Sequence, residues 1–249
     1  MGYNYKAYVP HGITFINMMG DMKHTWRDWR IVPTSRPVFK PPNVKKFEIE
    51  IPGADGLLDM TESLTREVHY NNRTGSLEFQ VENKWSWHNV YSDIMDFLHG
   101  QQMKAVLDDE PVFYYIGRFS VNDWKSDQMN SKIVIDYSVE PYKLEMFSSM
   151  EDWEWDTFNF ETGIIREYKE LRVDESLSFV IEGRRKSVIP SFTVVSDDGS
   201  GLKVTFNGTT YDLPDGTTRV VNIVTKAGAN TLVFTGNGTV SIDYRGGRL

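Results

Sequence analysis

The chain of 249 residues contains no cysteine, and this absence excludes several classes of protein. Without thiols there is no disulfide framework, no thiol nucleophile and no cysteine-ligated zinc or iron–sulfur site. The chain also lacks an apolar run of about 18 residues, so the sequence predicts no membrane span. Its first residues carry no basic stretch followed by an apolar one, so we expect no cleaved signal peptide.

An excess of basic residues is also missing. The formal net charge is −8, with 16 Lys and Arg against 20 Asp and Glu in residues 1–150 and 11 against 15 in the remainder. Domains that bind nucleic acid normally present a basic face, and neither half of this chain has the composition for one. We therefore expect no sequence-specific binding of nucleic acid.

Recognisable catalytic and cofactor motifs are absent as well. The five histidines form no HxH or HExxH pattern, and there is no GxSxG elbow or phosphate-binding glycine loop. The acidic runs Asp108-Asp109-Glu110 and Asp197-Asp198-Gly199 stand where turns are expected, and turn chemistry alone favours Asp there. The sequence thus predicts no enzyme, no cofactor and no metal site.

The composition changes near residue 155. All seven Trp and all five His precede Asp156, and the chain after it is rich in Gly, Thr, Asn and Val. Two halves of such different composition predict two domains, 1–155 and 156–249, with a linker within 150–170.

The first half has the pattern of an α+β domain with one helix on a β-sheet. Apolar residues of Ser86–His99 recur at helical spacing, with Ser86 as the expected N-cap and Gly100 after the C-terminus. Alternation or turn signals predict the following strands: a half-buried strand 44–51, a hairpin of 66–70 with 76–82, a hairpin of 103–107 with 112–121, and a strand 131–140. Residues 18–42 have no period and are expected to form a long loop or arm.

The second half is predicted to be nearly all strand. Asn207-Gly208 between 203–206 and 209–213 is a strong hairpin signal, and Gly236-Asn237-Gly238 between 232–234 and 239–244 suggests another. A further turn at 197–201 joins 192–195 to Leu202. Short strands with frequent turns predict a β-sandwich or jelly roll, so the whole chain is expected to be mainly β.

The aromatic content of 13% is high and admits two interpretations. Tyr114, Tyr115, Trp124, Trp153 and Trp155 could form a platform on which a sugar stacks, which makes a carbohydrate-binding module the alternative function. The same residue types are also common in cores and protein interfaces. A polysaccharide hydrolase would need two carboxylates at a defined spacing, and the sequence singles out no such pair.

Several short strings, taken in order, resemble the distal tail protein (Dit) family of siphovirus-type bacteriophages and prophages. The resemblance is densest from 56 to 143, and its strings are GLLDMTE at 56–62, YNNR at 70–73, YYIGR at 114–118, PYK at 141–143 and YRGGRL at 244–249. It implies an N-terminal ring-forming β-rich domain with one helix and a C-terminal galectin-like β-sandwich. It also implies a structural virion protein without enzyme activity.

The resemblance further implies a role and partners. Six copies would form a ring that joins the major tail tube protein to the tail-tip (Tal-like) protein. The C-terminal domains would anchor receptor-binding or baseplate proteins. The protein would be located at the tail tip of the virion, after assembly in the cytoplasm of the bacterial host.

A ring of subunits needs surfaces that join neighbouring copies. The aromatic segment 18–42 and the strand 44–51 are the candidates, and we expect Trp26, Trp29, Phe47 and Ile49 to contribute to the contact between subunits. The acidic balance of the chain also suits a lumen through which DNA slides without binding.

Overall fold

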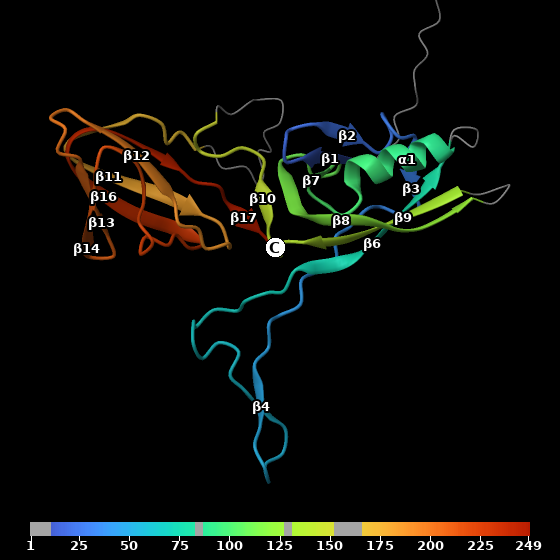
Figure 1. Ribbon diagram of the computed structural model, residues 1–249. Coiled ribbons are helices and arrows are strands. Elements are labelled where there is room, and N and C mark those ends of the chain that lie inside the picture. Colours follow the sequence, from blue (N-terminus) through green and yellow to red (C-terminus); the bar gives the residue numbers. More distant parts are fainter. Residues whose placement is uncertain (1–10, 83–86, 127–130, 152–165) are drawn as a thin grey trace, which may run out of the picture. The chain divides into compact units, whose positions relative to one another are not determined.

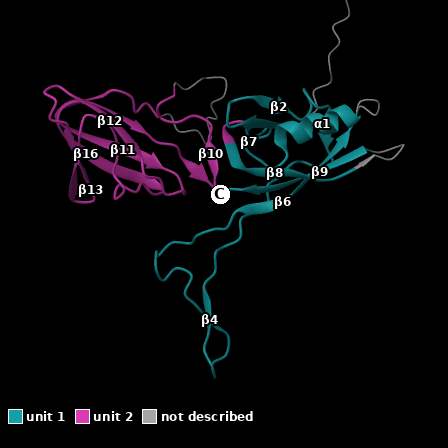
Figure 2. Cartoon of the chain, viewed as in Figure 1, with its two compact units in different colours: residues 1–110, 114–141 teal, residues 111–113, 142–249 magenta. Residues whose placement is uncertain are grey.

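The computed structural model describes residues 11–82, 87–126, 131–151 and 166–249. The chain divides into two compact units, one of residues 1–110 and 114–141 and the other of residues 111–113 and 142–249 (Figure 2). The expected boundary at residue 155 lies outside the described residues. Strands dominate both units, and the expected mainly β fold class is confirmed.

Unit 1 contains an antiparallel sheet in the order β2-β1-β7-β8-β9-β6-β3, with a helix packed on it (Figure 1). Its elements are β1 (Ile13–Asn17), β2 (Met22–His24), β3 (Ile31–Pro33), β6 (Arg73–Val81), α1 (Trp87–Leu98), β7 (Gln101–Leu107), β8 (Phe113–Ser126) and β9 (Ser131–Val139). Two further strands, β4 (Glu48–Glu50) and β5 (Leu57–Asp59), pair with each other in a separate small sheet.

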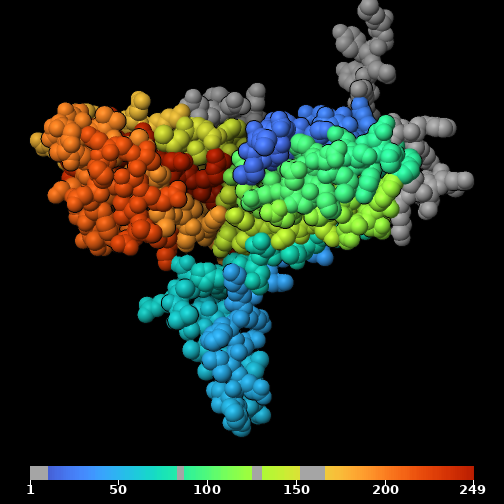
Figure 3. Space-filling model, in the orientation of Figure 1, coloured from blue at the N-terminus to red at the C-terminus, as the bar shows by residue number. Residues whose placement is uncertain are grey.

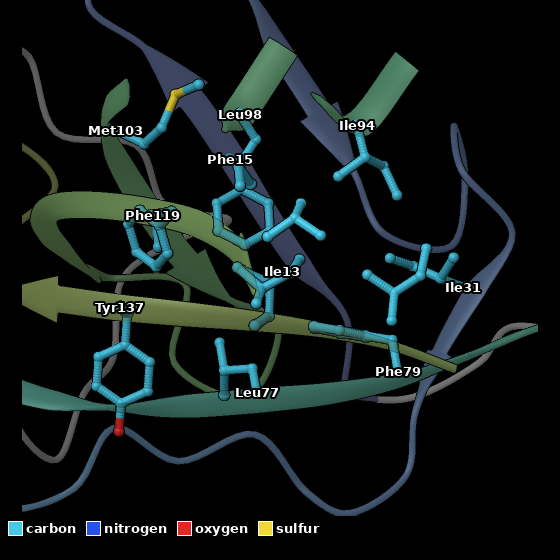
Figure 4. Packing of buried hydrophobic residues seen from close by; sticks show 14 of the residues in the cluster. Ile13, Phe15, Ile31, Leu77, Phe79, Ile94, Leu98, Met103, Phe119 and Tyr137 are labelled. Atoms are coloured by element: carbon cyan, nitrogen blue, oxygen red, sulfur yellow. The ribbon is translucent and has the colours of Figure 1, made fainter. Parts of the chain in front are cut away.

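The core of unit 1 follows from the periods of its elements. Every second residue of β9 is buried, as the alternation predicted, and Ile94 and Leu98 of α1 are fully buried against the sheet (Figure 4). The predicted helix is confirmed, and Gly100 after it has the positive φ of 72° expected of a residue that ends a helix. Ser86 lies outside the described residues.

One of the two predicted hairpins of unit 1 is correct. Strands β7 and β8 pair antiparallel across the turn at 108–111. The hairpin of 66–70 with 76–82 is wrong, because β6 pairs with β9 on one side and with β3 on the other. Tyr70 instead forms an isolated bridge with Val44. Strand β6 therefore pairs with strands that are distant in the sequence, and the turn-rich residues before it do not form a hairpin.

The expectation of a long loop or arm at 18–42 is wrong in part. Residues 22–24 and 31–33 form β2 and β3, strands of three residues each that are too short to produce a visible period. Between them Trp29 is only 1% exposed, and its Nε1 donates a hydrogen bond of 2.7 Å to Asp93 on α1. This stretch is therefore part of the core of unit 1.

Unit 2 is a curled antiparallel sheet around its own core. Its main strands are β11 (Leu171–Gly183), β12 (Ser191–Ser196), β13 (Leu202–Phe206), β14 (Thr209–Leu213), β15 (Gly216–Arg219) and β16 (Gly228–Asp243). They are ordered β14-β13-β16-β12-β15, with β11 also paired to β16. Two short strands, β10 (Lys143–Glu145) and β17 (Gly247–Arg248), pair beside them.

The hairpin of β13 and β14 is confirmed, and Asn207 and Gly208 both have positive φ at its turn. The hairpin expected around 236–238 is wrong, because β16 runs through this stretch as one strand. Gly236 and Gly238 mark the place where the strand that pairs with β16 changes from β13 to β12. A Cβ atom on Gly238 would lie 2.5 Å from the carbonyl oxygen of Val195, so glycine is required by this close approach.

Candidate protein-interaction surface

An arm of residues 43–71 leaves the sheet of unit 1 and carries β4 and β5 near its end (Figures 1 and 3). Its base is held by backbone hydrogen bonds of 2.8 Å from Lys45 to His69 and from Asn71 to Asn43. The Val44–Tyr70 bridge lies between these two bonds. The arm is therefore a hydrogen-bonded ribbon along much of its length.

The ribbon has two chemically different faces. Successive residues of a strand point to opposite faces, and directly paired residues share one. Ile49 pairs with Leu58, so both lie on the face that also takes Phe47 and Ile51. Glu48 pairs with Asp59, and these two lie on the opposite face with Glu50 and Leu57. One face of the arm is thus apolar and the other largely acidic.

The apolar face is uncovered. Its exposed fractions are 58% for Phe47, 40% for Ile49, 45% for Ile51 and 47% for Leu58. The strand predicted over 44–51 is shorter than expected, since β4 covers only Glu48–Glu50. The expectation that it is half-buried is wrong, because all three of its residues are exposed. An isolated ribbon of two strands is marginal in water, and apolar patches of this kind mark sites of protein contact.

The four residues expected at a subunit contact lie in different environments. Phe47 and Ile49 are exposed on the arm, and Trp26 is half-buried in the turn after β2 with the Arg30 guanidinium 4.8 Å from its ring centroid. Trp29 is a core residue, so its side chain has almost no surface with which to bind another copy. Whether these residues join subunits stays a prediction.

Sequence reasoning missed the second strand of the arm. Leu57 and Leu58 are 58% and 47% exposed and complete the ribbon. The signal was present, because an alternating apolar run followed by Pro52-Gly53 and then two leucines is the pattern of a strand, a turn and a returning strand.

The proposed sugar platform is not assembled by the residues that the structure describes. Tyr114 and Tyr115 are 6% and 7% exposed, so their faces are closed to a ligand, and burial raises the pKa of the Tyr115 phenol. Trp124 stacks on Tyr91 with the ring centroids 4.2 Å apart. Trp153 and Trp155 lie outside the described residues.

Two groups of titratable side chains in unit 1, one around His24 and one around Asp109, are engaged in hydrogen bonds within the fold. Nε2 of His24 lies 3.1 Å from Asp108, while its Nδ1 accepts hydrogen bonds from the backbone N–H groups of Trp26 and Arg27. Both ring nitrogens are therefore occupied in holding a turn. Partial burial raises the pKa of the neighbouring Asp109, but hydrogen bonds from Arg36 and His11 outweigh it and hold that pKa below its ordinary value.

The buried carboxylate of unit 2 is equally occupied. Glu145 accepts hydrogen bonds from Arg166 at 2.5 Å, from Arg184 at 2.9 Å and from the backbone N–H of Gly246 at 2.9 Å. With two guanidinium groups fixed to it, this carboxylate ties the C-terminal segment to the sheet and is poorly placed to transfer a proton.

Among the described residues, no cluster of three or more His, Asp or Glu side chains is placed to hold a metal ion. Within the same residues, no helix is long and apolar enough to cross a membrane. The feature of the described surface that most calls for a binding partner is therefore the apolar face of the arm.

Comparison with known proteins gives a structural likeness. No family model matches the sequence, and no curated protein matches it. Among solved structures, the fold is similar to the SPP1 Dit (gp 19.1) protein, described as a paradigm of the hub adsorption apparatus in phages that infect Gram-positive bacteria. The TM-score is 0.53 at 11% identity, over 94% of this chain and 98% of that chain. The chain thus has a Dit-like fold along nearly its whole length.

Proposed function

We propose that this protein is a structural component of a bacteriophage tail, an adaptor without enzyme activity. In this proposal the N-terminal units of six copies form a ring at the tip of the tail tube. The likeness to SPP1 Dit supports the assignment, because it covers both chains almost completely and includes both units.

The observation that carries the proposal is the uncovered apolar face of the arm. A monomer that worked alone would leave Phe47, Ile49 and Leu58 about half exposed on a ribbon of two strands. An assembly of copies would cover them, and hydrophobic burial is the main favourable term in stable association. A subunit with such an arm is suited to bind a neighbouring molecule through the apolar face.

The proposed partners follow from a position between tube and tip. The ring would bind the tail tube protein on one side and the tail-tip protein on the other, and the second unit would support receptor-binding or baseplate proteins. The protein would reside at the tail tip of the virion, after assembly in the cytoplasm of the bacterial host.

Native mass spectrometry and negative-stain imaging of the purified chain test the ring directly. We expect a species of six times the chain mass and ring-shaped particles, either alone at high concentration or when the cognate tube and tip proteins are added. A chain that stays monomeric with both proteins present would refute the proposal. Turnover of a cell-wall polysaccharide by the purified chain would refute the non-enzymatic assignment.

A further inference from the structure

Unit 2 has a long strand edge with no neighbouring strand among the described residues. Strand β11 (Leu171–Gly183) pairs along its whole length with β16, and no described strand pairs with its other side. Glu175 interrupts the extended backbone with a φ of 59°. Farther along, the C=O of Glu182 accepts a hydrogen bond of 3.1 Å from the Arg166 guanidinium. The open part of the edge is therefore 176–180.

The backbone groups of this stretch point alternately toward β16 and away from it, as in any antiparallel ladder. The N–H of Glu175 donates to a side chain of β16, whereas the C=O of Glu182 is bonded on the opposite side. The residues that point their N–H and C=O groups outward are therefore Ser176, Ser178 and Val180. All three are exposed, and beyond the ladder the described residues make no hydrogen bond to these groups.

The side chains of the open edge do not protect it against pairing. Residues 176–181 contain no charged residue, no glycine and no proline. Edge strands commonly carry a charge or a proline, which hinders the addition of a further strand. The strands at the ends of the two large sheets follow this rule, with Lys23 in β2, Pro33 in β3, Asp212 in β14 and Arg219 in β15. The open part of β11 is the exception among these edges.

We propose that the open edge of β11 binds an extended segment of a partner protein as an additional strand. Its outward N–H and C=O groups recur about every 7 Å along one line, which is the spacing of the backbone groups of another strand. Backbone hydrogen bonds of this kind supply the affinity in strand addition. The inference rests on the proposed function, in which unit 2 supports receptor-binding or baseplate proteins, and adds the mode of that contact.

The neighbouring side chains define the segment that fits. Leu177 and Phe179 are half-buried and pack against the core of unit 2. Apolar side chains at alternate positions of the added strand extend this layer, because paired residues share a face. The opposite face carries Ser176, Ser178 and Val180, beside which polar or β-branched side chains fit. The partner segment is thus extended, alternating and without proline at the paired positions.

The partner is a different protein, because a second copy fits the edge poorly. In the antiparallel register that uses all the outward residues of both copies, Asp174 of one copy would meet Glu182 of the other at both ends. Like charges at paired positions destabilise a pair of strands. Arg172 is already committed, since its two terminal nitrogens bind Asp197 at 2.9 and 2.7 Å. A segment with Lys or Arg at its ends avoids this repulsion.

Amide hydrogen exchange, measured by NMR on the full chain, tests whether the edge is open. We expect the amides of Ser176, Ser178 and Val180 to exchange about tenfold faster or more than those of Leu177 and Phe179, which are bonded to β16. Equal protection of the two sets would show that the edge is already covered, and would overturn the inference.

Binding is tested with a synthetic peptide of alternating Thr and Val with Lys at both ends. Its sequence reads the same in both directions, so it tests parallel and antiparallel addition together. The labelled peptide is titrated with the full chain and followed by fluorescence anisotropy. We expect saturable binding that slows the exchange of the three outward amides. A peptide that does not bind the wild-type chain overturns the inference.

Two variants show whether the peptide binds at this edge. Ser178→Pro removes the central outward N–H and keeps the ladder with β16, because proline is tolerated where the N–H has no partner. Val180→Lys adds the kind of charge that the other edges carry. Each should weaken binding about tenfold or more. The matched control Ser178→Thr keeps the N–H group and should bind like the wild type, and circular dichroism checks the folding of all three.

Equal binding to the wild type and to both variants would place the peptide elsewhere and overturn the inference. Self-association of the chain that Val180→Lys abolishes would make a second copy the occupant, and would overturn it as well. Ring formation with the tube and tip proteins is a separate readout, which Ser178→Pro should leave unchanged. If rings form but the edge binds no peptide, the inference fails while the proposed function stands.

Discussion

Removing the apolar face of the arm should weaken assembly strongly without unfolding the protein. The perturbation is the triple substitution of Phe47, Ile49 and Leu58 by Ser. About half of each side-chain surface remains exposed, at 58%, 40% and 47%. Full burial of such a side chain is worth about 1.5–3 kcal/mol, so covering the exposed half contributes about 1 kcal/mol each.

The three together give about 3 kcal/mol per contact, which corresponds to a change of about 100-fold in the dissociation constant. The free energy of unfolding of the isolated chain should change little, because exposed side chains away from the core usually contribute within about 0.5 kcal/mol each. Sedimentation velocity over a concentration series measures the first quantity, and denaturant unfolding at low concentration measures the second.

A matched control replaces Val180, Val195 and Val221 by Ser. These valines are 47%, 64% and 72% exposed but lie on unit 2, outside the proposed contact between copies. Their removal should leave the association of the chain unchanged. An arm variant that associates as tightly as the wild type would show that the apolar face makes no contact between copies. A valine control that loses association to the same degree would show that the effect is not specific to the arm.

Three further predictions concern stability and its dependence on pH. Trp29→Phe should lower the free energy of unfolding by about 1–3 kcal/mol in a urea titration, because it removes the hydrogen bond to Asp93 and leaves a buried gap; an unchanged midpoint would show that Trp29 is not a core residue. Gly238→Ala should lower the melting transition of unit 2, since its Cβ would lie 2.5 Å from a backbone oxygen and its φ is 157°; an unchanged transition in calorimetry would contradict this close approach. The lowered pKa of Asp109 stabilises the fold above the ordinary carboxyl pKa of 3.8, and this contribution is lost as the pH falls through the folded-state pKa. Arg36→Ala should therefore lower the midpoint of thermal unfolding at neutral pH, and the difference from the wild type should shrink below about pH 4. A difference that stays constant with pH would exclude the ion pair as its cause.

The sequence determined those elements whose signal is local. Alternating side chains specified β9, the apolar stripe specified α1, and Asn207-Gly208 specified the hairpin of β13 and β14. Each depends on the conformational preference of a few neighbouring residues. For the arm, the alternation of Phe47 and Ile49 correctly indicated a strand with one apolar face.

The tertiary structure decided which strands became neighbours and which faces were covered. The turn signals before β6 and inside β16 failed because partners far away in the chain paired with these strands. Trp29 and Phe47 belong to one residue class in the sequence, yet the first is buried under α1 and the second lies bare on the arm. Periodicity reports only the direction in which a side chain points, whereas its burial depends on what long-range packing brings to that side.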